Sequence, residues 1–205
     1  MDPWRLFFFK GGIMQHKDIQ KLTFTSVLVA TAFVFSLVTK FVPGLNLQMP
    51  QGGTVFGIAM LPLILIGMLM GVRHGIIGGM LYGLVSLLLD GVLYHWASLF
   101  SDYLIAFGLI GLSGLFKNGM HDVKSFVYAV LFVMMLRYLS HAIGGAIIFA
   151  EFAPEGVNPW FYSFVLYNLP YMASTTALTL AVGLVIRPRI RRIAIDFQLL
   201  EETYV

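Results

Sequence analysis

Long apolar runs, separated by short polar or glycine-rich breaks, divide this chain into six segments. Most of these runs approach the length of about 20 apolar residues that a helix needs to cross a bilayer. The second and third runs are short, which predicts that one of them is tilted or only partly exposed to lipid. The pattern predicts an all-α integral membrane protein with six transmembrane helices, at residues 22–42, 55–70, 75–93, 99–116, 125–150 and 161–186.

Proline and glycine mark the breaks between the runs, as at Pro43 after the first of them. Both residue types tend to end regular elements. We therefore expect one six-helix membrane domain at 22–186, between an N-terminal segment (1–21) and a C-terminal tail (187–205). Met14 is a second candidate start, and the residues before it would then be an extension.

The positions of the basic residues predict the orientation of the helices. Of the 13 Lys and Arg residues, 11 fall on one side of the six-helix arrangement. An excess of Lys and Arg marks the cytoplasmic side, so both termini are expected in the cytoplasm. The opposite side carries Asp90, Glu151 and Glu155, which makes it acidic and favourable to a cationic solute.

Composition agrees with a membrane protein and excludes several functions. The chain is 59% hydrophobic and 11% charged, whereas a soluble domain has about 25% charged residues. The net charge of +3 does not indicate nucleic acid, because the basic residues lie at helix ends. Without cysteine, metal-ligand spacing among the histidines or a phosphate-binding loop, we expect no metal, no cofactor and no ATP hydrolysis by this chain.

Two polar residues stand out in the fifth apolar run. Arg137 and His141 lie one helical turn apart and therefore share a helix face. A cation at membrane depth costs about 2.5 to 3.5 kcal/mol even on the more permissive scale. Such a residue indicates a functional site, and the next question is what polar or charged group it meets.

Further polar and aromatic residues gather in the outer halves of the last three runs and in the loop before the sixth. Aromatic faces bind cations and stack on flat rings, and a carboxylate accepts from a ring amine or offsets a cation. These features predict an outward-facing pocket for a flat, nitrogen-rich, cationic molecule. The candidate binding residues are Asp102, Tyr103, Arg137, Tyr138, His141, Glu151, Trp160, Tyr162 and Asn168.

Other interpretations of these residues stay open. The aromatic residues can form an interfacial belt, and Asn168 can satisfy a backbone group freed by Pro170. Asp102 can serve only to neutralise a buried cation, and Glu151 can be a solvated loop acid. An alternative from another class of protein is a small intramembrane enzyme that uses His141.

Small residues recur at four-residue spacing in the second and third runs. Such spacing lets helices approach closely in lipid, either inside one bundle or against another subunit. The first run carries a milder pair, Ser26 and Ala30, which is the better candidate for docking a partner. The glycines concerned are Gly67, Gly71, Gly75, Gly79 and Gly83.

Four stretches resemble a known family. They are MPQGG (49–53), LPLILIGMLMGVRHGIIGG (61–79), DYLIAFGLIGLSGLF (102–116) and RYLSHAIGGAIIFAEFAPEGVNPWFYSFVLYN (137–168). Together they are similar to the thiamine-specific substrate-binding S component of energy-coupling factor (ECF) transporters, the ThiT/YuaJ family. The resemblance covers about 22–186.

The resemblance implies a six-helix subunit of a bacterial plasma-membrane importer that binds its vitamin from outside and catalyses no reaction. Its implied partners are a membrane T component, two ABC ATPases and membrane lipid. The small pair Ser26 and Ala30 corresponds to the family's T-component contact. The family's binding positions fall on Asp102, Tyr103, Arg137, His141, Tyr162 and Asn168.

We therefore expect a thiamine-capturing S component that is not an enzyme. Capture of another vitamin, such as a thiamine precursor or pyridoxine, is the alternative within the same role. Gly53 and Gly57 stand where some relatives have a Trp and a Glu. The spacing from Tyr162 to Asn168 is one residue longer than the family pattern.

Overall fold

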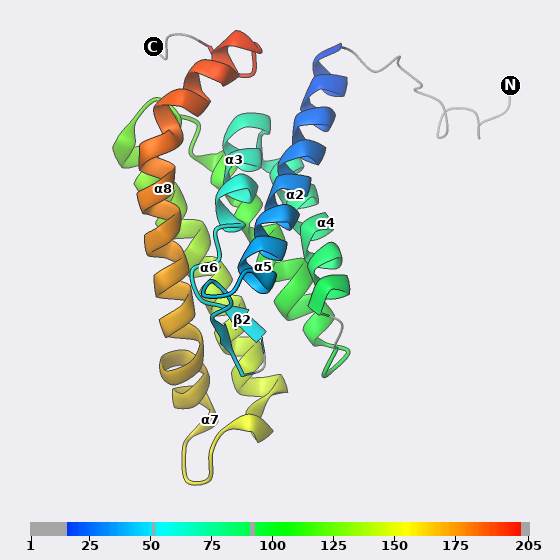
Figure 1. Cartoon of the computed structure of the whole chain (residues 1–205), viewed down its shortest axis with the longest axis vertical. Helices are drawn as coiled ribbons and strands as arrows, with labels where there is room; N and C mark the ends of the chain where they lie inside the picture. The colour runs from blue at the N-terminus through cyan, green and yellow to red at the C-terminus, as the bar shows by residue number, and fades with distance from the viewer. Residues whose placement is uncertain (1–15, 51, 91–92, 202–205) are drawn as a thin grey trace, which may run out of the picture.

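The computed structural model describes residues 16–50, 52–90 and 93–201, which form a helical bundle with a short β-hairpin (Figure 1). The expected N-terminal extension, Arg5, Lys10 and the end of the C-terminal tail lie outside the described residues. The elements in chain order are α2 (His16–Phe41), β1 (Gln48–Met49), β2 (Gly52–Thr54), α3 (Met60–Met70), α4 (Val72–Asp90), η1 (Leu99–Ile105), α5 (Ala106–Gly108), η2 (Leu109–Leu115), α6 (Val123–Ile148), η3 (Ala150–Phe152), α7 (Pro159–Phe161), η4 (Tyr162–Asn168) and α8 (Leu169–Asp196).

The lengths of the helices identify a multi-pass membrane protein. Within the described residues, four helices are long and apolar enough to cross a membrane, namely α2, α4, α6 and the continuous helix Pro159–Asp196. The helices Met60–Met70 and Leu99–Leu115 are apolar but shorter. By length and composition, four of the six expected spans are therefore supported.

The second apolar run is helical over only part of its length. Helix α3 begins at Met60 rather than near residue 55, because the chain before it turns through Phe56, whose φ is 60°. Strands β1 and β2 precede this turn as an antiparallel pair, with Gln48 opposite Thr54. The glycine-rich break predicted from the sequence is thus an ordered hairpin.

Helix α3 forms the centre of the bundle. All of its residues except Leu69 are buried, and α2, α4, η2 and α8 surround it. A helix that is apolar on every face is suited to such a buried position. This placement agrees with the prediction that one of the short runs is only partly exposed to lipid.

The regularly spaced glycines pack inside the bundle. Gly71, with φ of 90°, allows α4 to start directly after α3. A β-carbon on Gly79 would overlap the carbonyl oxygen of Phe107, and one on Gly111 would overlap the backbone at Gly75. The structure therefore supports internal packing, rather than a docking face, for these glycines.

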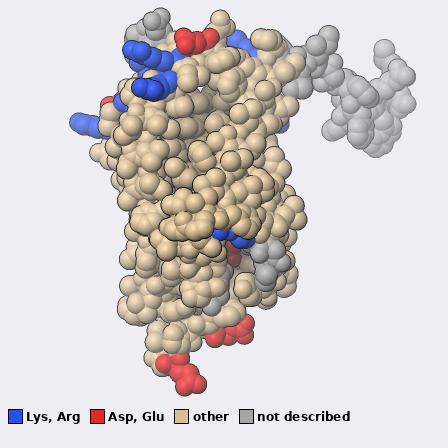
Figure 2. All heavy atoms as spheres, viewed as in Figure 1, with Lys and Arg blue, Asp and Glu red and all other residues tan. Residues whose placement is uncertain are grey.

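The start of α2 and the end of α8 lie at the same end of the bundle (Figure 1). Gln20 Nε2 donates a hydrogen bond to the Phe197 carbonyl oxygen at 2.6 Å, and Arg187 donates to that of Met120 at 3.0 Å. Figure 2 shows Lys and Arg atoms gathered at this end together with some acidic atoms, whereas the charged atoms at the opposite end are acidic. Burial and the charges of Arg191 and Arg187 lower the pKa of His121, so the neutral ring can accept the hydrogen bond from Arg191 Nε.

The glycine packing predicts a position that is sensitive to a single methyl group. Gly79→Ala should destabilise the protein, because overpacking a close contact costs about 1 to 3 kcal/mol. Thermal unfolding in detergent would measure the change. Ile77→Ala, at a half-exposed position of the same helix, is the matched control. An unchanged melting temperature for Gly79→Ala would contradict the close packing of α4 on α5.

Candidate functional site

A cavity of about 370 Å³ lies between the hairpin and the helices that follow it. Its walls come from α2, the hairpin, α4, η1, α5, α6, η4 and α8. Six of the nine binding residues predicted from the sequence line this cavity, although they come from separate apolar runs. They are Asp102, Tyr103, Arg137, His141, Tyr162 and Asn168.

Two irregular helical segments carry four of these residues. Segments η1 and η4 are π-helices, in which each turn is wider than in an α-helix. A π-turn accommodates one extra residue in a helix and occurs often at functional sites. Segment η4 begins at Tyr162 and ends at Asn168, so both predicted residues lie on one π-helical segment.

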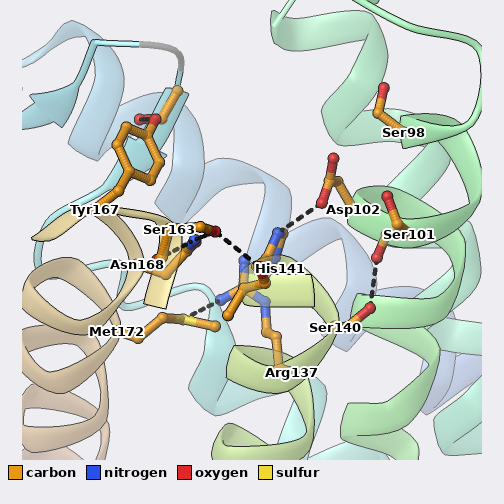
Figure 3. Close-up of polar contacts among 12 residues, drawn as sticks. Ser98, Ser101, Asp102, Arg137, Ser140, His141, Ser163, Tyr167, Asn168 and Met172 are labelled. Carbon is orange, nitrogen blue, oxygen red and sulfur yellow. Dashed lines mark hydrogen bonds and ion pairs between the residues drawn. The ribbon is translucent and has the colours of Figure 1, made fainter. Parts of the chain in front are cut away.

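Asp102 and His141 form the central polar pair of the cavity (Figure 3). Asp102 Oδ1 lies 3.1 Å from His141 Nδ1, and the two side chains are 17% and 13% exposed. A carboxylate at Nδ1 favours the tautomer with its proton there, which leaves Nε2 as an acceptor. Within the described part of the chain, His141 Nε2 is buried and has no hydrogen-bond partner.

A pair of glycines on α6 allows both π-helical segments to approach this helix. A β-carbon on Gly144 would lie 3.1 Å from Ser101 Oγ, and one on Gly145 would overlap Ser163 Oγ. Ser140 Oγ donates to the Ser101 carbonyl oxygen at 2.7 Å and so ties α6 to η1 (Figure 3). The local sequence of α6 therefore sets how close the cavity walls lie.

Arg137 lies one turn deeper on α6, in apolar surroundings. Its Nη1 lies 3.0 Å from the sulfur of Met60 and 3.8 Å from that of Met172. The guanidinium carbon is 4.5 Å from the ring centroid of Phe107, a cation–π contact. Among the described residues Arg137 has no carboxylate partner, because Asp102 pairs with His141 instead.

Three predicted residues are not among those lining the cavity. Tyr138 donates its hydroxyl to the Phe164 carbonyl oxygen at 2.9 Å, and Trp160 stacks on Phe164 with ring centroids 5.8 Å apart. Trp160 is half-exposed and Glu151 is exposed. Their positions match the alternatives of an interfacial aromatic group and a solvated loop acid.

Aromatic residues nearby line the cavity in their place. Phe149 and Phe152 come from the same loop region, and Tyr94 approaches both from the loop after α4. The ring centroid of Tyr94 lies 6.4 Å from that of Phe149 and 6.0 Å from that of Phe152. The loop therefore contributes Phe152 to the cavity wall, whereas Trp160 was the predicted residue.

Helix α8 carries further polar cavity residues that were not predicted from the sequence. Tyr171 and Thr175 are buried, line the cavity and follow Asn168 at helical spacing. This three- and four-residue spacing was visible in the sequence and could have identified them. Tyr82, which forms a hydrogen bond with Ser36, also lines the cavity, and Ser86 follows it at the same four-residue spacing.

Known proteins with similar sequences belong to one family. The chain matches the family model described as thiamine transporter protein (Thia_YuaJ) over residues 22–194. It is 34% identical over 190 residues to the thiamine transporter ThiT of Bacillus subtilis, which covers 86% of this chain and 96% of that protein. It is 32% identical over 95 residues to ThiT of Lacticaseibacillus paracasei, covering 42% of this chain and 47% of that protein.

A solved structure supports the fold. The structure of ThiT from Listeria monocytogenes superposes with a TM-score of 0.73, covering 87% of this chain and 99% of that chain. Its sequence is 18% identical to this one, so the likeness concerns the fold alone.

Proposed function

Because the chain belongs to the thiamine transporter protein family, which confirms the resemblance in its sequence, we propose that it captures thiamine in the cavity described above. In this proposal it is the S component of an ECF-type importer in the bacterial plasma membrane. Both relatives are transporters by name, which argues against catalysis by this subunit. The observation that carries the proposal is the Asp102–His141 pair facing an aromatic cavity.

The chemistry of thiamine complements this pair. Thiamine joins an aminopyrimidine to a positively charged thiazolium ring that carries a hydroxyethyl group. The amino group can donate to the carboxylate of Asp102 or to the vacant Nε2 of His141. The hydrogen bond to the carboxylate is charge-assisted and contributes about 1.5 to 3 kcal/mol, whereas one to the neutral imidazole contributes about 0.5 to 1.5 kcal/mol.

Aromatic residues and Arg137 supply the other contacts in this proposal. Tyr103, Tyr162 and Phe149 line the cavity and offer ring faces to the flat rings of thiamine. Arg137 has no carboxylate among the described residues to offset its charge, so like-charge repulsion disfavours the thiazolium beside it. The hydroxyl end of thiamine, a neutral acceptor, is the part that suits Arg137.

We extend the proposal to the membrane arrangement, with six crossings and both termini in the cytoplasm. The basic residues gather where α2 starts and α8 ends (Figure 2), and the domain would run over 22–186 with cytoplasmic segments on either side. Helix α3 is only about 16 Å long at 1.5 Å per residue. The hairpin and the cavity above α3 would occupy the remaining depth, where irregular backbone is tolerated.

A partner subunit is the second part of the proposal. The chain has no nucleotide-binding loop, so uphill transport needs ATPases supplied by other proteins. Ser26 and Ala30 are exposed on α2, and the Ser26 hydroxyl bonds back to the Leu22 carbonyl oxygen at 3.0 Å. This surface is small and has its polar group satisfied, which suits close contact with the membrane T component of an ECF module carrying two ABC ATPases.

Removing either half of the central pair should weaken thiamine binding. Asp102→Asn and His141→Ala should each lower the affinity by more than about tenfold, because each loses a charge-assisted hydrogen bond. Calorimetric titration of the detergent-solubilised protein measures this, with the exposed Asp18→Asn as control. Unchanged affinity in both variants would reject the site.

The same assay tests the vitamin and the class of protein. Tighter binding of a thiamine precursor or of pyridoxine would replace thiamine within the transporter role. Chemical conversion of an added vitamin by the purified protein, detected by mass spectrometry and abolished by His141→Ala, would instead support an enzyme. Recovery of intact thiamine with the purified protein is the expected result.

Cysteine labelling tests the membrane arrangement, and the native chain has no cysteine to interfere. Asn118→Cys and Glu155→Cys introduce thiols at exposed positions in loops at opposite ends of the bundle. With cytoplasmic termini, a membrane-impermeant reagent added to whole cells should label residue 155 and not residue 118. The reverse pattern would invert the proposed orientation.

A bulky residue on α2 should separate binding from transport. Ala30→Trp is expected to abolish ATP-dependent uptake into proteoliposomes containing the full complex, because it obstructs close helix contact. Thiamine binding by the isolated subunit should persist, since Ala30 does not line the cavity. Leu131→Trp, at an exposed position of α6, is a control for added bulk. Uptake that survives Ala30→Trp would place the docking surface elsewhere.

A further inference from the structure

The amide of Asn168 is held by a chain of buried hydrogen bonds (Figure 3). Its Nδ2 donates to the Ser163 carbonyl oxygen at 2.9 Å and to Ser163 Oγ at 3.1 Å. Ser163 Oγ donates in turn to the Ala142 carbonyl oxygen on α6 at 2.7 Å. At the other end, the Tyr171 hydroxyl donates to Asn168 Oδ1 at 2.8 Å.

The partners of Asn168 determine which way its amide faces. A backbone carbonyl can only accept, so the group beside the Ser163 carbonyl must be the NH₂. The Ser163 hydroxyl has its proton committed to Ala142 and therefore also accepts from Asn168. Both amide hydrogens are thus used, and the hydrogen-bonding capacity left on Asn168 is the second lone pair of Oδ1.

A glycine makes this network possible. A β-carbon on Gly145 would overlap Ser163 Oγ and lie 3.4 Å from Asn168 Nδ2. Gly145 also lines the cavity, and the absence of a side chain there leaves room on α6 for the Ser163 and Asn168 side chains of η4. Because Ser163, Asn168 and Tyr171 are each at most 4% exposed, water does not compete for their hydrogen bonds.

We propose that Ser163 and Tyr171 are positioning residues that hold the Asn168 amide so that it presents its carbonyl oxygen, rather than its NH₂ group, to the ligand. The site then selects a ring bearing an amino group over one bearing a carbonyl at the same place. This inference rests on the proposed function, since it takes the aminopyrimidine of thiamine as that ring.

The physical basis is the asymmetry of hydrogen-bond recognition. A site built to bond a donor rejects an analogue lacking that donor, because its buried acceptors are left unpaired. Asn168 Oδ1 gains nothing from a ring carbonyl, which is also an acceptor. Loosening the amide should therefore weaken binding of the amino ligand and leave that of a carbonyl analogue nearly unchanged.

The test compares thiamine with oxythiamine, the analogue in which a ring carbonyl replaces the amino group. Wild-type protein should prefer thiamine. Tyr171→Phe keeps the ring but removes the donor to Asn168, and it should lower this preference by about threefold to tenfold, the value of one neutral hydrogen bond. A purely structural role for Tyr171 would weaken binding of both ligands alike, so equal losses overturn the proposal.

A double-mutant cycle separates positioning from direct contact. If Tyr171 acts through Asn168, Tyr171→Phe should add no loss of thiamine affinity in an Asn168→Ala background. If the fold losses of thiamine affinity in the two single variants multiply in the double variant, the Tyr171 hydroxyl contacts the ligand itself. That result would overturn the positioning role. Tyr128→Phe, on an exposed position of α6, is the matched control.

Two further variants keep the test available if Tyr171→Phe does not fold. Ser163→Ala removes the acceptor for Asn168, and Gly145→Ala displaces the Ser163 side chain. Both should lower the preference for thiamine as Tyr171→Phe does, and an unchanged preference in both overturns the proposal. Wild-type protein that binds no thiamine would reject the proposed function instead, so the two failures are distinguishable.

Discussion

Lipid offers the backbone no hydrogen-bond partner, so the N–H and C=O groups of a buried chain must be paired within the protein or face a cavity. This constraint explains where the helices of this protein are irregular. The π-helical segments η1 and η4 and the β-hairpin all contribute residues to the cavity wall. Side chains also compensate for irregular backbone, since Thr175 accepts from the Gly57 amide at 3.0 Å and donates to the Thr54 carbonyl oxygen at 3.2 Å. The two π-helical segments and the hairpin therefore lie where their backbone groups can face the cavity.

The apolar runs and the placing of Asp102, Arg137 and His141 in one polar site could be predicted from sequence, because they depend on local pattern and on the cost of burying charge. Which of the two basic residues Asp102 pairs with could not. Asp102 and His141 are distant in the chain, but a charged or polar side chain at membrane depth needs a polar partner. In the structure these two side chains form a hydrogen bond with each other. The hairpin could not be predicted in this way. Its glycines signal only a break, and the bonds that order it come from Thr175 on the last helix. The π-helices could not be predicted either, because the apolar pattern around η1 and η4 does not distinguish a π-helix from an α-helix.

Arg137 shows a different limit of sequence reasoning. Its burial was expected, and a carboxylate partner was the natural assumption for a buried cation. The structure surrounds the guanidinium with Phe107 and the sulfur atoms of Met60 and Met172, contributed by three other helical segments. Polarisable sulfur and an aromatic face offset part of the desolvation without neutralising the charge. Asp102 is consequently available to His141 and to a ligand, rather than consumed by a salt bridge with Arg137.

The cavity thus separates its charges along α6. The guanidinium of Arg137, which has no carboxylate partner among the described residues, lies one helical turn from His141. The Nε2 atom of His141 has no hydrogen-bond partner among these residues and can accept a hydrogen bond. The carboxylate of Asp102 lies beside the same ring. Asn168 adds a further acceptor, because Ser163 has taken both of its amide hydrogens. In the proposed function, a ligand with amino donors at one end and a neutral acceptor at the other pairs with the acceptors Asp102, His141 and Asn168 and with the donor Arg137. The same ligand in the reverse orientation would leave these buried groups unpaired. In a low-dielectric cavity such mismatches are costly, so the fixed polarity of these side chains determines orientation as well as affinity.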